Sequence, residues 1–200
     1  MLVIFDRSGS MAGEWMTAAG PLPRWRVASD ALAEALEPLA TRTTVGAILF
    51  PTGPRSVPDT CADVAPIESQ IDFRDGRAFS STWATLWTTT TVGGSTPLDA
   101  AFTRADEALP RDDQVTAVVV LTDGMPTCSE PVTAWDRAAS WRARGISTWV
   151  VGLPGAHGLE TLDRIARAGG TESSLSVDDP AALTEALGAI VGEVVEQACL

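Results

Sequence analysis

The chain has 200 residues, of which 45% are hydrophobic, and this suits a globular domain with a sizeable core. Acidic residues outnumber basic ones by 26 to 14, a net charge of −12, which argues against nonspecific binding to the polyphosphate of nucleic acid. No apolar run approaches the roughly 20 residues of a membrane-spanning helix, so we expect no direct membrane insertion.

The first half of the chain alternates between strand and helix patterns. The continuous apolar run at residues 2–5 is typical of a strand that is covered on both faces. A glycine-bearing turn and a proline-containing loop at residues 20–23 follow it. Helical spacing of apolar side chains then extends over residues 25–39, and Pro38 is expected to end that helix. Residues 44–50 are typical of a second strand.

Residues 51–77 have a different character, because they are rich in proline and aspartate and only weakly periodic. We expect an irregular excursion there, with a short strand near residues 70–73. A short helix is predicted at residues 81–91. Thr96 and Asp99 then form a capping-box-like pair at the start of the next helix.

The second half of the chain continues the alternation. Residues 115–121 are nearly all apolar and β-branched, and they form the strongest strand pattern in the chain. The other predicted elements are a helix at residues 133–144, a strand at 148–151, a helix at 159–168, a weak edge strand at 173–177 and a final helix that Asp179 and Pro180 open. This alternation indicates an α/β fold, with a doubly wound, mostly parallel central sheet flanked by helices on both faces. We expect residues 1–200 to form one domain, and the start within a buried strand suggests a domain of a longer protein.

Side chains with oxygen atoms gather where several of these elements begin or end. These residues are Asp6, Ser8 and Ser10 after the first strand, Thr96 before a helix, and Asp123 after the strongest strand. In open parallel sheets, ligands bind outside the carboxyl ends of the strands, so we expect the five residues to meet at one rim. Two carboxylates and three hydroxyls suit a hard cation such as Mg²⁺ better than zinc or copper. Taken singly, each residue also suits a turn or a helix cap.

These residues together resemble the motif of a known protein family. Asp6-x-Ser8-x-Ser10, a threonine in the loop Gly-Ser-Thr96-Pro, and Asp123-Gly124 after an apolar strand together resemble the metal-ion-dependent adhesion site (MIDAS) of von Willebrand factor type A domains. The wider run at residues 5–11 is similar to the bacterial form of that motif. The resemblance covers nearly the whole chain in order and spacing.

The resemblance implies a metal-dependent protein-binding module without enzymatic activity. Ser8, Ser10 and Thr96 would contact the ion directly, and Asp6 and Asp123 would act through bound water. Mg²⁺ is the expected ion, and Mn²⁺ and Ca²⁺ also suit such a site. The partner would be a protein that offers a Glu or Asp side chain to the ion. The similar proteins are exported bacterial ones, which implies an extracellular, periplasmic or cell-surface location.

The three cysteines are Cys61, Cys128 and Cys199, and none belongs to a C-x-x-C pair of the kind that holds structural zinc. If the excursion folds over the predicted rim, Cys61 comes near Cys128, and the resemblance to secreted bacterial members supports a disulfide between them. Cys199 would then have its partner beyond the chain. The alternative is a set of reduced thiols in a cytosolic protein.

Two other function classes stay open. An Asp at the end of a first strand is also a nucleophile in some Rossmann-like hydrolases and phosphotransferases. Such enzymes need further carboxylates and a lysine, whereas Ser8 stands at the second position after Asp6 and all 14 basic residues are arginine. The other class is a scaffold whose metal is only structural.

Three further residues invite an interpretation. Trp15 lies shortly after the predicted metal loop, where an exposed indole would add to partner contact, whereas most of the seven tryptophans fall at core positions. Arg7 is expected to point away from the inward-facing oxygens, either into solvent or toward a residue that itself holds the ion. His157 is the only histidine, and we expect it in a surface loop.

Overall fold

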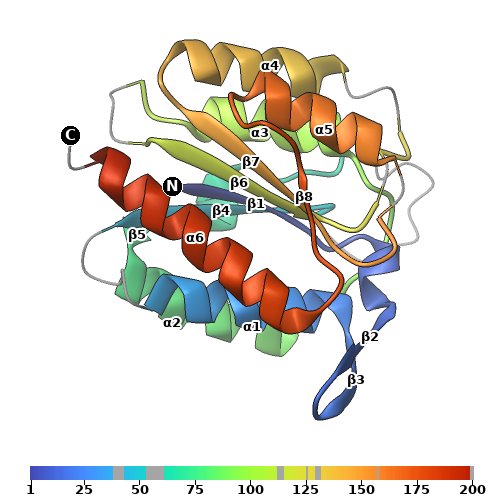
Figure 1. Cartoon of the computed structure of the whole chain (residues 1–200). Coiled ribbons are helices and arrows are strands. Elements are labelled where there is room, and N and C mark those ends of the chain that lie inside the picture. The colour runs from blue at the N-terminus through green and yellow to red at the C-terminus, as the bar shows by residue number, and fades with distance from the viewer. Residues whose placement is uncertain are drawn as a thin grey trace.

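A computed structural model describes the chain in seven stretches, residues 1–37, 43–52, 61–111, 115–124, 126–128, 132–156 and 158–198. A six-stranded sheet lies between two layers of helices (Figure 1). Helices α1, α2 and α6 cover one face of the sheet, and α3, α4 and α5 cover the other. The expected α/β architecture with helices on both faces is confirmed.

The sheet has the strand order β5-β4-β1-β6-β7-β8. Its strands are β1 (Leu2–Asp6), β4 (Thr44–Phe50), β5 (Ile71–Asp75), β6 (Ala117–Thr122), β7 (Ser147–Gly152) and β8 (Leu175–Ser176). Only the edge strand β5 runs antiparallel to its neighbour, and the other pairings are parallel. All residues of β1 and β6 are buried, as expected for central strands covered on both faces.

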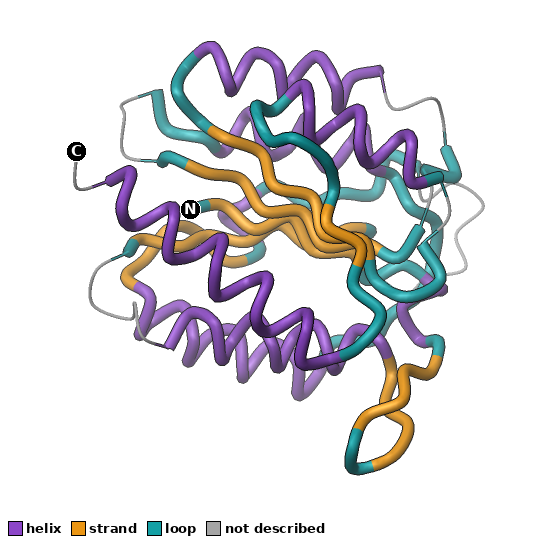
Figure 2. The backbone as a smooth tube through the Cα atoms, viewed as in Figure 1, coloured by secondary structure: helices purple, strands orange, loops and turns teal. Residues whose placement is uncertain are grey.

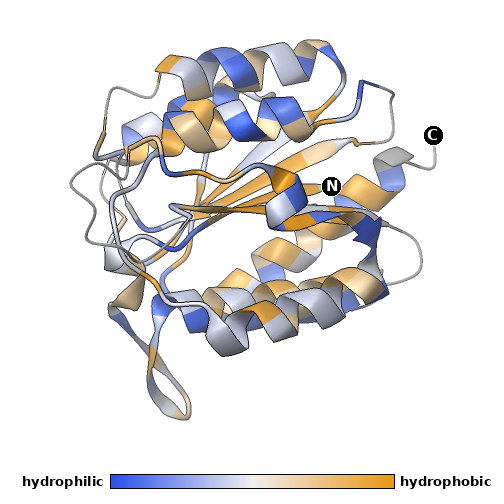
Figure 3. Ribbon diagram, turned by 180° about the vertical axis from the view of Figure 1, so that it is seen from behind, coloured by the Kyte–Doolittle hydropathy of each residue, from blue (hydrophilic) through white to orange (hydrophobic). Residues whose placement is uncertain are grey.

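The helices are α1 (Arg24–Leu36), α2 (Gly76–Thr89), α3 (Leu98–Ala108), α4 (Val132–Ala143), α5 (Leu159–Ala168) and α6 (Pro180–Ala198). Figure 3 shows the apolar strands enclosed between these layers. Each face of the sheet has its own hydrophobic core. Among the described residues, no helix combines the length and the apolarity needed to cross a membrane.

Aromatic rings fill the core beneath the end of β1. Phe5 packs edge-on against Trp83 and Trp87, with both ring centroids 5.2 Å from its own. Trp25 of α1 stacks on Trp87 with a centroid distance of 4.7 Å. This cluster connects β1, α1 and α2 directly behind the residue at which β1 ends.

The segment between β1 and α1 differs from the expected loop. It forms an antiparallel hairpin, β2 (Glu14–Thr17) and β3 (Gly20–Pro23), that projects from the body of the molecule (Figure 2). Within the turn, Thr17 Oγ1 donates to the carbonyl of Gly20 at 2.7 Å, and Gly20 has a φ of +113°. Prolines are tolerated in β3 because this strand lies at an edge. The prediction of a loop at residues 20–23 was therefore wrong.

The described part of the excursion, residues 51–52 and 61–77, contains more regular structure than its composition suggests. Within its described part, Val64 and Ile67 are buried in the core on the α3 side, and Arg104 Nε of α3 donates to the carbonyl of Val64 at 2.9 Å. Its last residues form β5 and the start of α2, so irregular structure does not extend to residue 77.

Two helix starts also differ from expectation. Helix α2 begins at Gly76 rather than at residue 81, because the Asp75 carboxylate caps it by accepting hydrogen bonds from the backbone N–H groups of Arg77 and Ala78. The capping-box-like pair Thr96 and Asp99 does not form. Asp99 instead accepts a hydrogen bond from the backbone N–H of α4 residue Ala134.

Candidate metal centre

The carboxyl ends of β1 and β6 bring the two predicted aspartates to one rim of the sheet. These strands are parallel neighbours, with Phe5 opposite Leu121. Asp6 ends β1 and is fully buried, and Asp123 directly follows β6 and is 2% exposed. Thr122 Oγ1 donates to Asp6 Oδ2 at 2.6 Å, which connects the two strand ends.

The loop after β1 turns its serine side chains toward Asp123. The backbone N–H of Ser8 donates to Asp6 Oδ1 at 2.7 Å, which closes the turn. The hydroxyl oxygens of Ser8 and Ser10 are 3.0 Å apart, and Ser10 Oγ donates to Asp123 Oδ1 at 2.6 Å. Hydrogen bonds therefore connect Asp6 to the backbone of Ser8, and the hydroxyls of Ser8 and Ser10 to the Asp123 carboxylate.

The loop before α3 brings Thr96 to the same place. Two backbone hydrogen bonds attach this loop to the serine loop: Gly9 donates to Gly94, and Gly93 donates to the carbonyl of Arg7. Thr96 is buried, and a Cβ atom built on Gly124 would be 3.6 Å from its Oγ1 and 3.8 Å from Ser10 Oγ. The structure thus gathers all five predicted residues, and their role as metal ligands stays a prediction.

Burial makes negative charge costly at this site. Removal of the Asp6 carboxyl group from water raises its pKa to about 7, and nearby Asp123 acts in the same direction. Hydrogen bonds from Thr122 and Ser8 oppose this shift without cancelling it. A cation close to the carboxylates would relieve the cost.

The donor set indicates which cation suits the site. The five side chains offer only oxygen, and no cluster of three or more His, Cys, Asp or Glu residues that could hold a metal occurs in the described part of the chain. A set of two carboxylates and three hydroxyls lacks the nitrogen and sulfur donors that zinc and copper prefer, and it suits a hard divalent ion that keeps some of its waters. The residues present fit such an ion.

The sequence interpretation missed Arg24. Its Nη1 lies 2.6 Å from Asp123 Oδ2, so the second oxygen of this carboxylate is held by an ion pair. Arg24 is the first residue of α1, and the first turn of that helix contains no acidic residue. Because the amino end of a helix disfavours a positive charge, an arginine there was the signal that could have pointed to a nearby carboxylate.

The expected disulfide between Cys61 and Cys128 is present. It joins the connection between β4 and β5 to the connection between β6 and α4, so the excursion is covalently attached beside the rim that holds Asp123. Cys199 lies outside the described residues.

The remaining predictions have mixed outcomes. Trp15 is only 4% exposed and its Nε1 donates to the carbonyl of Asp178 at 3.2 Å, so the idea of an exposed indole for partner contact was wrong. Arg7 Nε donates to the carbonyl of Pro51, so its side chain is held beside the end of β4 rather than extended into solvent. His157 lies outside the described residues.

No protein-family model matches the chain, and no curated protein does. Among solved structures, it is similar to a von Willebrand factor type A protein from Catenulispora acidiphila, with 18% identity over 97% of this chain and 42% of that one and a TM-score of 0.68. It is also similar to proximal thread matrix protein 1 from the mussel byssus, whose MIDAS motif is occupied by zinc. The identity there is 16% over 99% of this chain and 45% of that one, with a TM-score of 0.65. The pilus adhesin SpaC from Lactobacillus rhamnosus GG is 13% identical over 98% of this chain and 30% of that one, with a TM-score of 0.69. The chain spans less than half the length of each of these proteins.

Proposed function

We propose that this chain, which has the von Willebrand factor type A fold, is a divalent-cation-dependent protein-binding module of the adhesion type. The observation that carries the proposal is the convergence of two buried carboxylates and three hydroxyls at one rim of the sheet. The residues that would hold the ion are Asp6, Ser8, Ser10, Thr96 and Asp123.

Mg²⁺ is the proposed ion, because the donors are all hard oxygens. The hydroxyls of Ser8, Ser10 and Thr96 would contact it directly. Asp6 and Asp123 already accept hydrogen bonds from neighbouring groups, which supports a role through bound water. When bound, the ion supplies positive charge to which a partner's Glu or Asp side chain can coordinate.

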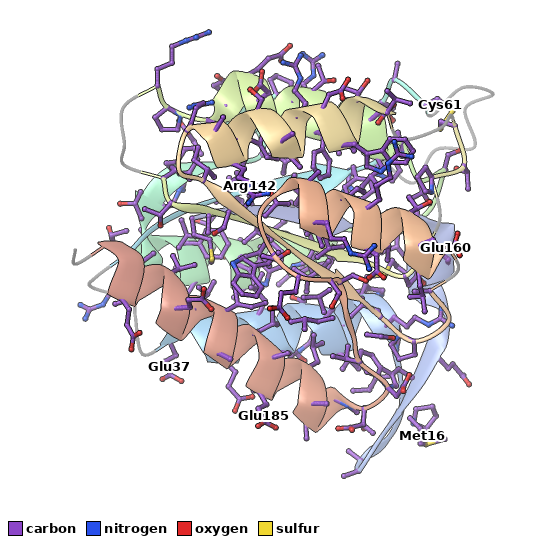
Figure 4. The ribbon with its side chains drawn as sticks, turned by 45° about the horizontal axis from the view of Figure 1, so that its top comes forward. Met16, Glu37, Cys61, Arg142, Glu160 and Glu185 are labelled. Atoms are coloured by element: carbon purple, nitrogen blue, oxygen red, sulfur yellow. A yellow bond between two sulfur atoms is a disulfide. The ribbon has the colours of Figure 1, made fainter. Side chains whose placement is uncertain are left out.

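The surroundings of the site support a protein as the partner. Among the described residues, the exposed large hydrophobic side chains are Met16, Leu22, Val132 and Leu159. All four lie in or directly after the connections that follow β1, β6 and β7, at the rim that carries the aspartates. Figure 4 labels Met16, Glu160 and Cys61 along this one side of the molecule. Exposed apolar side chains at this rim would gain free energy if a partner protein covered them.

A location outside the cytoplasm belongs to the same proposal. The Cys61–Cys128 disulfide favours an oxidising compartment. Two of the similar structures come from an external thread and a pilus, and they support an adhesive role. A hydrolase is disfavoured because the chain contains no lysine and no third carboxylate joins the described cluster.

The proposal can be tested by titrating Mg²⁺ and Mn²⁺ into metal-stripped protein by calorimetry. The wild type should bind one ion, and Asp6→Asn and Ser8→Ala should lose this binding. Asp30→Asn is a matched control, because Asp30 is exposed on α1 and pairs with Arg26 at the surface. At a hundredfold excess of ion over Kd, the wild type should gain about 2.7 kcal/mol of stability against unfolding.

A second step concerns the partner. Candidate protein ligands should bind only with the ion present and should lose binding when their acidic residue is changed to an amide. Partner binding that persists in EDTA would instead favour the scaffold with a structural metal. Absence of ion binding by the wild type would end the adhesion proposal.

A further inference from the structure

Arg24 occupies a position that the helix alone does not explain. It opens α1 after Pro23, at the end of the helix where the aligned peptide dipoles repel a positive charge. Its side chain turns back to the rim, where Nη1 contacts Asp123 Oδ2 at 2.6 Å and lies 3.4 Å from the carbonyl oxygen of Ser10. The position of this guanidinium is therefore set by the candidate site.

The guanidinium lies in a slot between two glycines. A Cβ atom on Gly13 would be 3.1 Å from Arg24 Cζ, and one on Gly155 would be 2.8 Å from Arg24 Nη2. Gly13 belongs to the β1–α1 connection and Gly155 to the β7–α5 connection, so two separate segments leave room for the same group. Nε is buried and has no hydrogen-bond partner among the described residues. The pairing with Asp123 compensates for this burial.

We propose that Arg24 is a built-in counter-cation of the candidate site, which neutralises Asp123 when no metal is bound and weakens the binding of a divalent ion. The inference rests on the proposed function, since it concerns the same site. The Asp123 side chain is fully buried, whereas that of Arg24 is 20% exposed. A buried carboxylate without a partner would be costly, so the ion pair keeps the rim folded in the absence of metal.

The same ion pair opposes the metal in two ways. A divalent ion among the hydroxyls would lie within several ångströms of a fixed positive charge, and like charges repel strongly in partly buried surroundings. The ion would also find Asp123 already neutralised. The ion is thus held weakly by the domain alone, and a partner that adds a carboxylate would increase its affinity. By linkage, the ion would strengthen partner binding by the same factor.

The test uses Arg24→Met, which keeps an unbranched apolar stem and removes the charged guanidinium group. Calorimetric titration of Mg²⁺ into metal-stripped protein should give a Kd about tenfold or more lower in the variant than in the wild type. In EDTA the variant should melt at a lower temperature than the wild type, and saturating Mg²⁺ should narrow this difference. Arg24→Lys retains the charge and should return the Kd toward the wild-type value.

Arg26→Met is the matched control, because Arg26 lies on the same helix and pairs with Asp30 at the surface. It should change neither the Kd nor the melting temperature in EDTA. If wild type binds Mg²⁺ and Arg24→Met binds it equally or more weakly, Arg24 does not oppose the ion. This inference is then overturned, while the proposed function stands. If neither protein binds Mg²⁺, the proposed function is overturned with it. Should Arg24→Met be unfolded in EDTA, refolding by Mg²⁺ supports the inference and failure to refold overturns it.

Discussion

At the scale of single residues, Asp6 makes the stability of the metal-free protein depend on pH. Burial raises its pKa from 3.8 to about 7, so the folded state holds the proton more tightly than the unfolded state does. Between these two pH values the folded protein binds more protons, and its stability falls as the pH rises. We therefore expect the contribution of Asp6 to the stability of metal-stripped protein to fall from about pH 4 to about pH 7 and to level off above that. The buried amino terminus of Met1, whose pKa is lowered to about 5, contributes in the opposite direction above pH 5.

Urea unfolding in EDTA at a series of pH values measures this dependence. Asp6→Asn, which cannot ionise, should lack most of the decline. Saturating Mg²⁺ should lessen the decline, because an ion compensates the charged carboxylates. A wild-type profile identical to that of Asp6→Asn would contradict the assignment of the pH dependence to this residue.

Gly155 provides a second test at the residue scale. Its φ is +83°, and a Cβ atom there would clash with the Arg24 guanidinium. Gly145 has nearly the same φ, +79°, but a Cβ atom there would meet nothing within 4 Å. Both Gly→Ala changes should cost about 1 kcal/mol through the backbone, and Gly155→Ala should cost more because it also displaces Arg24.

Chemical denaturation of the two variants separates these contributions. The extra loss in Gly155→Ala should disappear when Arg24→Met is added, since the shorter side chain no longer fills the slot. Equal losses in Gly145→Ala and Gly155→Ala would show that the guanidinium tolerates the added methyl group.

The five predicted donors illustrate what a sequence can reveal about a site. Asp6, Ser8 and Ser10 could be proposed as metal ligands because alternate oxygen-bearing side chains, in a short loop directly after a buried strand, are typical of a cation site. The partner of Arg24 could not be identified, because Asp123 is far away in sequence and is brought near only by the packing of α1 against the rim; the sequence offered only the unfavourable place of an arginine at the amino end of a helix. Long-range ion pairs leave no periodic pattern in a sequence.

At the scale of elements, the hairpin β2–β3 has two unlike faces. Trp15 pairs with Leu22, and Trp15 is buried with its indole N–H bonded to the carbonyl of Asp178 ahead of α6. Met16 pairs with Pro21 on the opposite face and is 69% exposed. Trp15 therefore attaches the hairpin to the body, and Met16 on the other face is available to a partner.

Substitutions on the two faces should affect different properties, protein stability on one face and partner binding on the other. Trp15→Ala should destabilise the protein by about 3–5 kcal/mol, because it opens a large cavity under the hairpin. Trp15→Phe should cost about 1 kcal/mol through loss of the hydrogen bond together with a small loss of packing. Met16→Ser should leave urea unfolding unchanged and weaken only partner binding. Substantial destabilisation by Met16→Ser would show that the exposed face also contributes to folding.

The sequence predicted the central elements well, because their signals are local. Strand β4 and helix α5 begin and end where the apolar pattern places them. The hairpin was missed because β2 and β3 are short and prolines usually mark loops, and the early start of α2 depends on a side-chain cap that the apolar pattern does not contain. The fold class follows from periodicity, whereas caps and turns follow from individual hydrogen bonds.

At the scale of the whole molecule, the disulfide connects segments that are 67 residues apart in sequence. In the chain-entropy model, closing a loop of this length restricts the unfolded state by about 4 kcal/mol. The double variant Cys61→Ser, Cys128→Ser should therefore unfold at clearly lower denaturant concentration, and reducing agent should have a similar effect on the wild type. Cys199→Ser is the control and should retain the wild-type response. A double variant as stable as the wild type would show that the cross-link adds little.

The aromatic cluster beneath the rim has a consequence for experiments on this protein. Phe5 immediately precedes Asp6, and Trp25 immediately follows Arg24, so Asp6 and Arg24 are each bonded to a residue whose ring contacts the indole of Trp87. Closely packed indoles give strong near-ultraviolet circular dichroism and mutually dependent fluorescence. Small shifts of β1 or α1 on ion binding should change these spectra, and the molecule thus contains its own optical label for occupancy of the site.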